Sequence, residues 1–126
     1  MFRLGSHPLN LAVRFILEIA MLLALGFWGY HIAAQGRHYW WALLFPTLAM
    51  SLWAIFATRN DPSRSGKTFV QTPGPIRLAL EWTLFSCAIW ACFDLSIPRL
   101  GAVFLAVTVL HYILSWDRIL WLLGQR

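Results

Sequence analysis

The sequence predicts an all-α membrane protein, a four-helix transmembrane bundle built from two parallel helical-hairpin repeats. The composition is 60% hydrophobic and only 12% charged, whereas ordinary soluble domains have about 25% charged residues. Four apolar segments are each long enough to cross a bilayer, and they cover residues 8–31, 38–57, 75–95 and 98–123. With 126 residues in total, one transmembrane domain fills the chain.

The first two apolar segments form the first hairpin. Pro8 suits an early helical position, where its missing N–H is not needed, and Gly36 marks the break between the two helices. Pro46 lies within the second segment, where it removes one backbone hydrogen bond and predicts a kink. Thr47 and Ser51 lie close enough to help satisfy the freed backbone groups.

A hydrophilic loop at residues 58–74 separates the two hairpins. It is rich in proline, glycine and serine, which predicts irregular structure. Its Gly66-Lys67-Thr68 resembles the end of a nucleotide-binding loop, but Asp61 occupies the position of the required first glycine. We therefore interpret the loop as a solvated basic connector.

Basic residues are distributed unevenly between the two ends of the predicted helices. The two short turns hold only Arg37 and Arg99, whereas the termini and the middle loop hold Arg3, Arg59, Arg64, Lys67, Arg118 and Arg126. Because cytoplasmic loops carry the excess of lysine and arginine, we expect both termini in the cytoplasm and the chain in the inner membrane. The net charge is +5, but the basic residues do not form a single patch with interleaved aromatics, so nucleic acid is not an expected partner.

One short motif occurs twice, 63 residues apart, as VRFILE at residues 13–18 and IRLALE at residues 76–81. Each copy puts an arginine and a glutamate on one helical face, within a segment where a charge costs about 2.5–3.5 kcal/mol. We expect two repeats related by a pseudo-twofold axis along the membrane normal. Four charged side chains would then meet in the interior: Arg14, Glu18, Arg77 and Glu81.

Three pairings of these four side chains remain open. Each arginine can pair with the glutamate of its own helix, or Arg14 with Glu81 and Arg77 with Glu18 across the axis, or both. Together with His111 in the fourth segment, the four charges are expected to form a polar layer in the cytoplasmic half of the membrane. The supporting members of this layer would be Thr47, Ser51 and Asp117.

Two functions are compatible with such a layer. It can bind or conduct a small solute, proton or lipid group, with Glu18 and Glu81 exchanging protons and His111 titrating nearby. Alternatively, the arginine–glutamate pairs are purely structural, and the protein is an accessory or assembly subunit. The expected partners are membrane lipids and, for so small a chain, a second copy or a larger membrane protein.

No cofactor, metal or catalytic residue is expected. Closely spaced His, Cys and carboxylate ligands of a zinc site are missing from the sequence, and His7 and His31 belong near opposite membrane surfaces, which does not suit haem. A G-x-S-x-G motif is also missing, so we expect a non-enzymatic protein. Cys87 and Cys92 are about 140° apart around one helix and are not expected to bridge.

Three stretches together resemble a known family: residues 8–31, residues 53–56 leading into 59–62, and residues 73–81. They resemble the YrdB-like group of small bacterial inner-membrane proteins, a domain of unknown function, over nearly the whole chain. The resemblance implies a four-span bacterial membrane protein in which the Arg14/Glu18 and Arg77/Glu81 positions follow the family pattern. It implies no activity, substrate or cofactor.

Overall fold

The computed structural model describes residues 7–32, 38–59, 61 and 68–125. These ranges contain five helices and two short strands: α1 (Pro8–Ile32), α2 (His38–Ile55), β1 (Phe56–Ala57), β2 (Val70–Gln71), α3 (Gly74–Asp94), α4 (Pro98–Leu114) and α5 (Trp116–Leu123). α1 and α3 match the predicted segments 8–31 and 75–95 to within one residue at each end.

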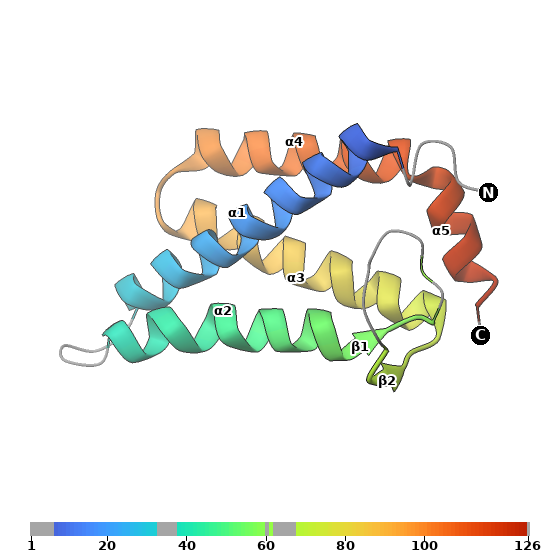
Figure 1. The fold of residues 1–126 in the computed structure, drawn as a ribbon. Coiled ribbons are helices and arrows are strands. Elements are labelled where there is room, and N and C mark those ends of the chain that lie inside the picture. The colour runs from blue at the N-terminus through green and yellow to red at the C-terminus, as the bar shows by residue number, and fades with distance from the viewer. Residues whose placement is uncertain (1–6, 33–37, 60, 62–67, 126) are drawn as a thin grey trace.

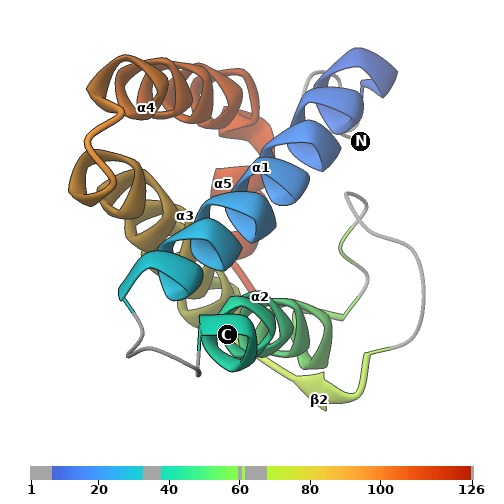
Figure 2. The same cartoon turned by 90° about the vertical axis from the view of Figure 1, so that its left-hand side faces the viewer.

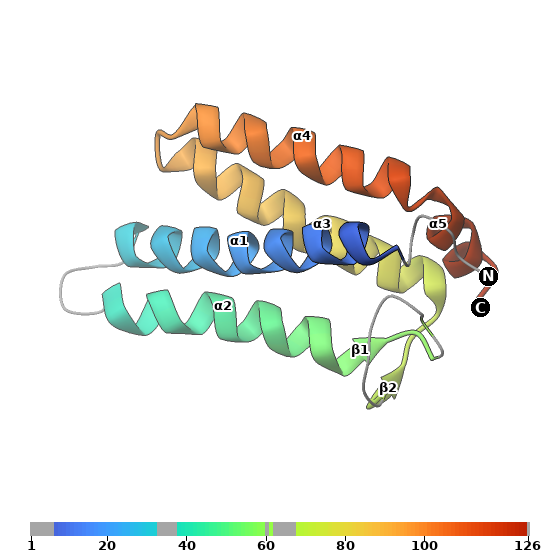
Figure 3. The same ribbon diagram turned by 45° about the horizontal axis from the view of Figure 1, so that its top comes forward.

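Helix α1 lies in the middle of the molecule. α2 runs alongside it on one side, and α3 and α4 lie on the other (Figures 1 and 3). The end-on view shows α1 crossing obliquely over this arrangement (Figure 2). Of the 18 residues of α2 only Ala49 is buried, because α2 packs mainly against α1. The predicted bundle is therefore confirmed only as a mostly helical fold, and its four-helix architecture stays a prediction.

The start of α1, the two strands and the end of α5 lie at one end of the molecule (Figure 1). The turn between α3 and α4 lies at the other. By length and composition α1 and α3 each suit a membrane span, and α4 with α5 would form a third if the two are one broken span. These features are consistent with a membrane protein. A crossing by α2, the pseudo-twofold relation and the cytoplasmic termini stay predictions.

The predicted segment 98–123 is not one straight helix. α4 and α5 are separated by a bend of 68° at Ser115, whose backbone N–H still donates to the carbonyl of His111 (2.9 Å). The bend brings α5 against the start of α3, where the Gly74 N–H donates to the carbonyl of Gln125 (2.5 Å). A Cβ at Gly74 would overlap the backbone of Leu122. Only glycine therefore fits this approach without displacing α5.

Strand pairing replaces part of the predicted irregular loop. The second segment, expected to remain helical to residue 57, ends at Ile55, and Phe56–Ala57 pairs in parallel with Val70–Gln71. Next to this pairing, the Thr58 hydroxyl donates to the carbonyl of Thr72 (2.8 Å). These bonds hold the end of α2 beside the segment that leads into α3.

Two glycines allow α1 to approach α2 closely. A Cβ at Gly29 would overlap the carbonyl of Trp41, and one at Gly26 would lie 3.4 Å from the carbonyl oxygen of Ala42. The latter carbonyl is the one that Pro46, four residues later, leaves without its usual donor. Small residues of this kind permit close contact between helix backbones in membranes.

Candidate functional site

The buried polar side chains are organised around Glu81 on α3, whose side chain is completely inaccessible. Its Oε1 accepts hydrogen bonds from the Tyr112 hydroxyl (2.7 Å) and from Nη1 of Arg118 (3.0 Å). Its Oε2 accepts from Nε of Arg77 (2.8 Å), Nη2 of Arg118 (2.8 Å) and Nη2 of Arg14 (2.9 Å). One carboxylate thus joins α1, α3, α4 and α5.

Two further carboxylates balance the charge of the arginines. Asp61, between α2 and α3, binds Arg118 through both oxygens, at 3.1 Å to Nε and 2.5 Å to Nη2. Glu18 lies 3.6 Å from Nε of Arg14 and keeps 26% of its side chain exposed. Three cations therefore face three anions. We call these six residues the ionic network: Arg14, Glu18, Asp61, Arg77, Glu81 and Arg118. An unbalanced charge in this interior would cost several kcal/mol.

Arg77 also ties α2 to the ionic network. Its Nη1 donates to the carbonyls of Trp53 and Phe56, both at 2.6 Å, at the helix end where carbonyls lack helical donors. The Trp53 ring centroid lies 4.7 Å from Cζ of Arg77 and 5.0 Å from Cζ of Arg14, within the range of cation–π contacts. The C-terminal end of α2 is thereby fixed against α1 and α3.

The observed pairing combines two of the predicted arrangements. Arg14 contacts Glu81 between helices, while Arg77 contacts Glu81 and Arg14 contacts Glu18 within their own helices. Among the described contacts, Arg77 pairs with Glu81 and not with Glu18. The two copies of the repeated motif are therefore not equivalent: Glu81 is the centre of the network, and Glu18 lies at its edge.

His111 is buried, as expected for a residue of the polar layer, but its hydrogen bond is not to a glutamate. Its Nδ1 lies 2.9 Å from Oδ1 of Asn10, and Nδ2 of Asn10 donates to the Ser115 hydroxyl (2.7 Å). His111 Nε2 has no hydrogen-bond partner within the described ranges. This trio forms a second polar contact between the start of α1 and the end of α4.

Among the described contacts, the supporting residues predicted on α2 have no hydrogen bond to the ionic network. Thr47 is exposed, and the Ser51 hydroxyl donates to the Thr47 carbonyl one turn earlier (2.8 Å). Because α2 packs mainly on α1, this part of its surface does not reach the ionic network. Asp117 lies in the first turn of α5 and accepts a hydrogen bond from the backbone N–H of Arg118 (2.8 Å).

Three central residues of the ionic site are not among the predicted site residues: Asp61, Tyr112 and Arg118. Arg118 belongs to the basic residues expected to face the cytoplasm, yet only 1% of it is exposed. Its position before the apolar run 119–123 is the signal that indicates burial, as the apolar surroundings do for Arg14 and Arg77. Asp61 lies in the loop expected to be solvated. For Asp61 no local pattern indicates burial.

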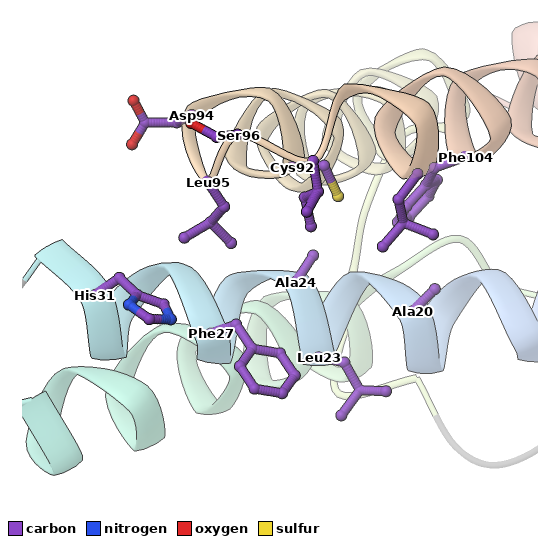
Figure 4. Close-up of a pocket in the computed structure, with 12 residues that line it drawn as sticks. Ala20, Leu23, Ala24, Phe27, His31, Cys92, Asp94, Leu95, Ser96 and Phe104 are labelled. Carbon is purple, nitrogen blue, oxygen red and sulfur yellow. The ribbon is translucent and has the colours of Figure 1, made fainter.

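A separate cavity of about 690 Å³ lies between α1 and the turn that joins α3 to α4 (Figure 4). Its walls are apolar and include Leu23, Phe27 and Leu100. Three polar residues lie at one end of it: His31, Asp94 and Ser96. Oδ2 of Asp94 accepts a hydrogen bond from the indole N–H of Trp28 (2.8 Å). Because the cavity lies towards the ends of α1 and α3, it is distinct from the ionic network near their starts.

Comparison with known proteins gives a family without an assigned activity. The family described as "Protein of unknown function (DUF2568)" matches residues 12–109. The chain is also 41% identical over 117 residues to the "Uncharacterized protein YrdB" of Bacillus subtilis (strain 168). This alignment covers 92% of this chain and 94% of that protein. No solved structure matches.

Proposed function

This chain belongs to the DUF2568 family, whose function is unknown, and we propose that it is a non-enzymatic membrane protein. In this proposal it binds a lipid of the surrounding bilayer in the cavity beside α1. In this proposal the ionic network is structural and holds the helices that form the cavity walls.

The number of hydrogen bonds to the Glu81 carboxylate supports a structural role of the ionic network. Glu81 receives six hydrogen bonds from four side chains. A transported ion or proton would have to displace at least one of these bonds in a site closed to solvent. Replacing a paired buried charge in this way is costly, because the other partners are left uncompensated.

The dimensions and walls of the cavity support lipid binding, and its volume is the single observation that carries the proposal. About 690 Å³ lies within the usual range of about 300–1,000 Å³ for ligand sites. Leu23, Phe27 and Leu100 line the cavity and are each more than half exposed, so it opens to the side. In a membrane the molecules at such an opening are lipids.

The proposal is tested by filling the cavity from α4. Leu100→Trp places a large ring at the cavity, while Val103→Trp, on the same helix and equally exposed, is not among the cavity-lining residues. Native mass spectrometry of the purified proteins should show lipid retained by the unaltered chain and by Val103→Trp but lost from Leu100→Trp. Equal lipid retention by both variants, or none by the unaltered chain, would contradict lipid binding in this cavity.

An accessory or assembly subunit is a second candidate, and the surface of α2 favours it. Leu43 and Leu48 are 66% and 52% exposed, and Ala49 alone is buried in this helix, so α2 offers a face to another membrane helix. If the protein is such a subunit, a partner protein should co-purify with it in a fixed ratio, and the Leu48→Trp variant should no longer bind that partner. Purification of the chain without any partner from its native membrane would speak against it.

A further inference from the structure

A second groove lies beside the cavity of Figure 4, on the other side of the same residues. It has a volume of about 540 Å³ and runs between α1 and α2, past Gly26, Ala42 and Pro46. Three residues of α1 line both spaces: Leu23, Phe27 and His31. The two grooves are therefore neighbours that share one wall.

This shared wall is an exposed ridge on α1. Leu23 is 57% and Phe27 61% exposed, and in Figure 4 both side chains point away from the α3–α4 turn. On one side of the ridge lies the cavity next to Leu100, and on the other lies the groove next to Ala42. A molecule with two apolar chains can occupy both spaces only if one chain lies on each side of Phe27.

Building on the proposed lipid-binding function, we propose that the two grooves take the two acyl chains of one phospholipid, with its head group beside His31. The class of ligand is thus a two-chain lipid rather than a single-chain amphiphile. The two volumes and their common residues carry this assignment.

The length of the grooves fits one leaflet of a bilayer. The cavity runs along α1 from Ala20 to His31 and the groove from Leu22 to His31, which at 1.5 Å per residue is about 16 Å and about 14 Å. Half of a hydrocarbon core of about 30 Å is about 15 Å. Both grooves therefore cover one leaflet, and His31 lies at the level of the head groups.

The polar and aromatic residues gather at this same level. Asp94 and Ser96 line the cavity beside His31, and Tyr30 and Tyr39 line the groove beside it. The two tyrosine rings meet edge to face at 5.6 Å between centroids. Tyrosine and tryptophan prefer the boundary between acyl chains and head groups. Both grooves thus have their polar end on the same side, as the two chains of one lipid require.

The test blocks one groove at a time. Leu100→Trp fills the cavity, Ala42→Trp fills the groove, and Val103→Trp and Leu43→Trp are matched controls on the same two helices, outside both linings. Each delipidated protein is titrated with a diacyl phosphatidylglycerol and with its single-chain lyso form, and bound lipid is counted by native mass spectrometry. Helix content and thermal unfolding confirm that each variant is folded, and Ala42→Leu replaces Ala42→Trp if the larger ring prevents folding.

We expect one diacyl lipid per chain, at least tenfold weaker binding in either groove variant, unchanged binding in both controls, and weaker binding of the lyso form throughout. Two lyso lipids per chain, each lost from one groove variant only, would overturn the two-chain assignment while leaving lipid binding intact. Weaker binding of the diacyl lipid in Leu100→Trp but not in Ala42→Trp would also overturn the two-chain assignment while leaving lipid binding intact. No lipid binding by the unaltered chain would refute the proposed function itself.

Discussion

Replacement of Glu81 by glutamine tests the ionic network at its centre. Glutamine keeps the shape of the side chain but removes the charge that three arginines share. In the unaltered protein three cations face three anions. After the change Arg14, Arg77 and Arg118 face only Glu18 and Asp61, and one positive charge stays buried without compensation.

The expected loss is large. Removing one partner of a buried pair costs about 3–5 kcal/mol, which is a hundredfold to a few thousandfold change in the unfolding equilibrium at 1.4 kcal/mol per factor of ten. Unfolding in mixed micelles with increasing sodium dodecyl sulfate, followed by tryptophan fluorescence, measures this difference.

The matched control is Glu18→Gln, the same change in the other copy of the motif. Glu18 lies 3.6 Å from Arg14 and is 26% exposed, and Arg14 keeps its contact with Glu81 when the Glu18 charge is removed, so the loss should cost no more than about 1 kcal/mol. Equal losses for the two variants, or an unchanged stability of Glu81→Gln, would show that burial and multiple pairing do not distinguish the two glutamates.

Three further predictions concern the same structure. Combining Arg14→Glu with Glu81→Arg in one variant should not restore the stability lost in either single variant, because the new arginine would face Arg77 and Arg118. Recovery to near the stability of the unaltered protein would show that the Arg14–Glu81 pair acts independently of the other two arginines. Tyr112→Phe should lower the free energy of unfolding by about 1.5–3 kcal/mol, since it removes a hydrogen bond to a charged group, and an unchanged denaturation midpoint would contradict that bond. Gly29→Ala should destabilise the chain by about 1–3 kcal/mol, because the new Cβ would overpack against the α2 backbone. Gly26→Ala should cost less, since its Cβ would lie 3.4 Å from the nearest atom. If thermal unfolding gave the reverse order of stability, it would contradict the α1–α2 packing.

The parts of the fold that the sequence predicted well are those fixed by local pattern and by the cost of burial. α1 and α3 are long apolar segments with clear ends, and each contains a motif whose charges have to turn inward. The cost of leaving Arg14 or Glu81 in lipid predicts that both side chains turn inward, while their mutual contact is one of three pairings that the sequence leaves open.

The parts that were missed depend on contacts between distant segments. Asp117 and Arg118 interrupt the apolar segment 98–123, but nothing local fixes the direction of the 68° bend that brings Arg118 to Glu81. Asp61 reaches Arg118 across 57 positions of sequence. Such contacts arise from how helices pack, and a single chain read locally does not contain them.

The two copies of the repeated motif have different partners for a reason that the sequence does contain. At the 63-residue offset of the repeat, Arg118 corresponds to Ile55 and Tyr112 to Ala49. Glu81 therefore gains two partners that the other half does not supply for Glu18. The repeated motif predicts where charges lie along each helix, while the residues packed around it determine which carboxylate becomes the centre.

The most direct test of a structural ionic network is the distance between the Glu81 carboxyl carbon and the guanidinium nitrogens, measured by solid-state NMR dipolar recoupling in lipid bilayers. The oxygen–nitrogen distances are 2.8 Å to Arg77 and Arg118 and 2.9 Å to Arg14, so we expect strong dephasing of the Glu81 carboxyl carbon. The dephasing should weaken, without vanishing, when any one of these arginines is replaced by a lysine whose nitrogen is unlabelled. Absence of dephasing in the unaltered protein would contradict it, because Glu81 would then lie apart from the arginines that are proposed to hold the helices together.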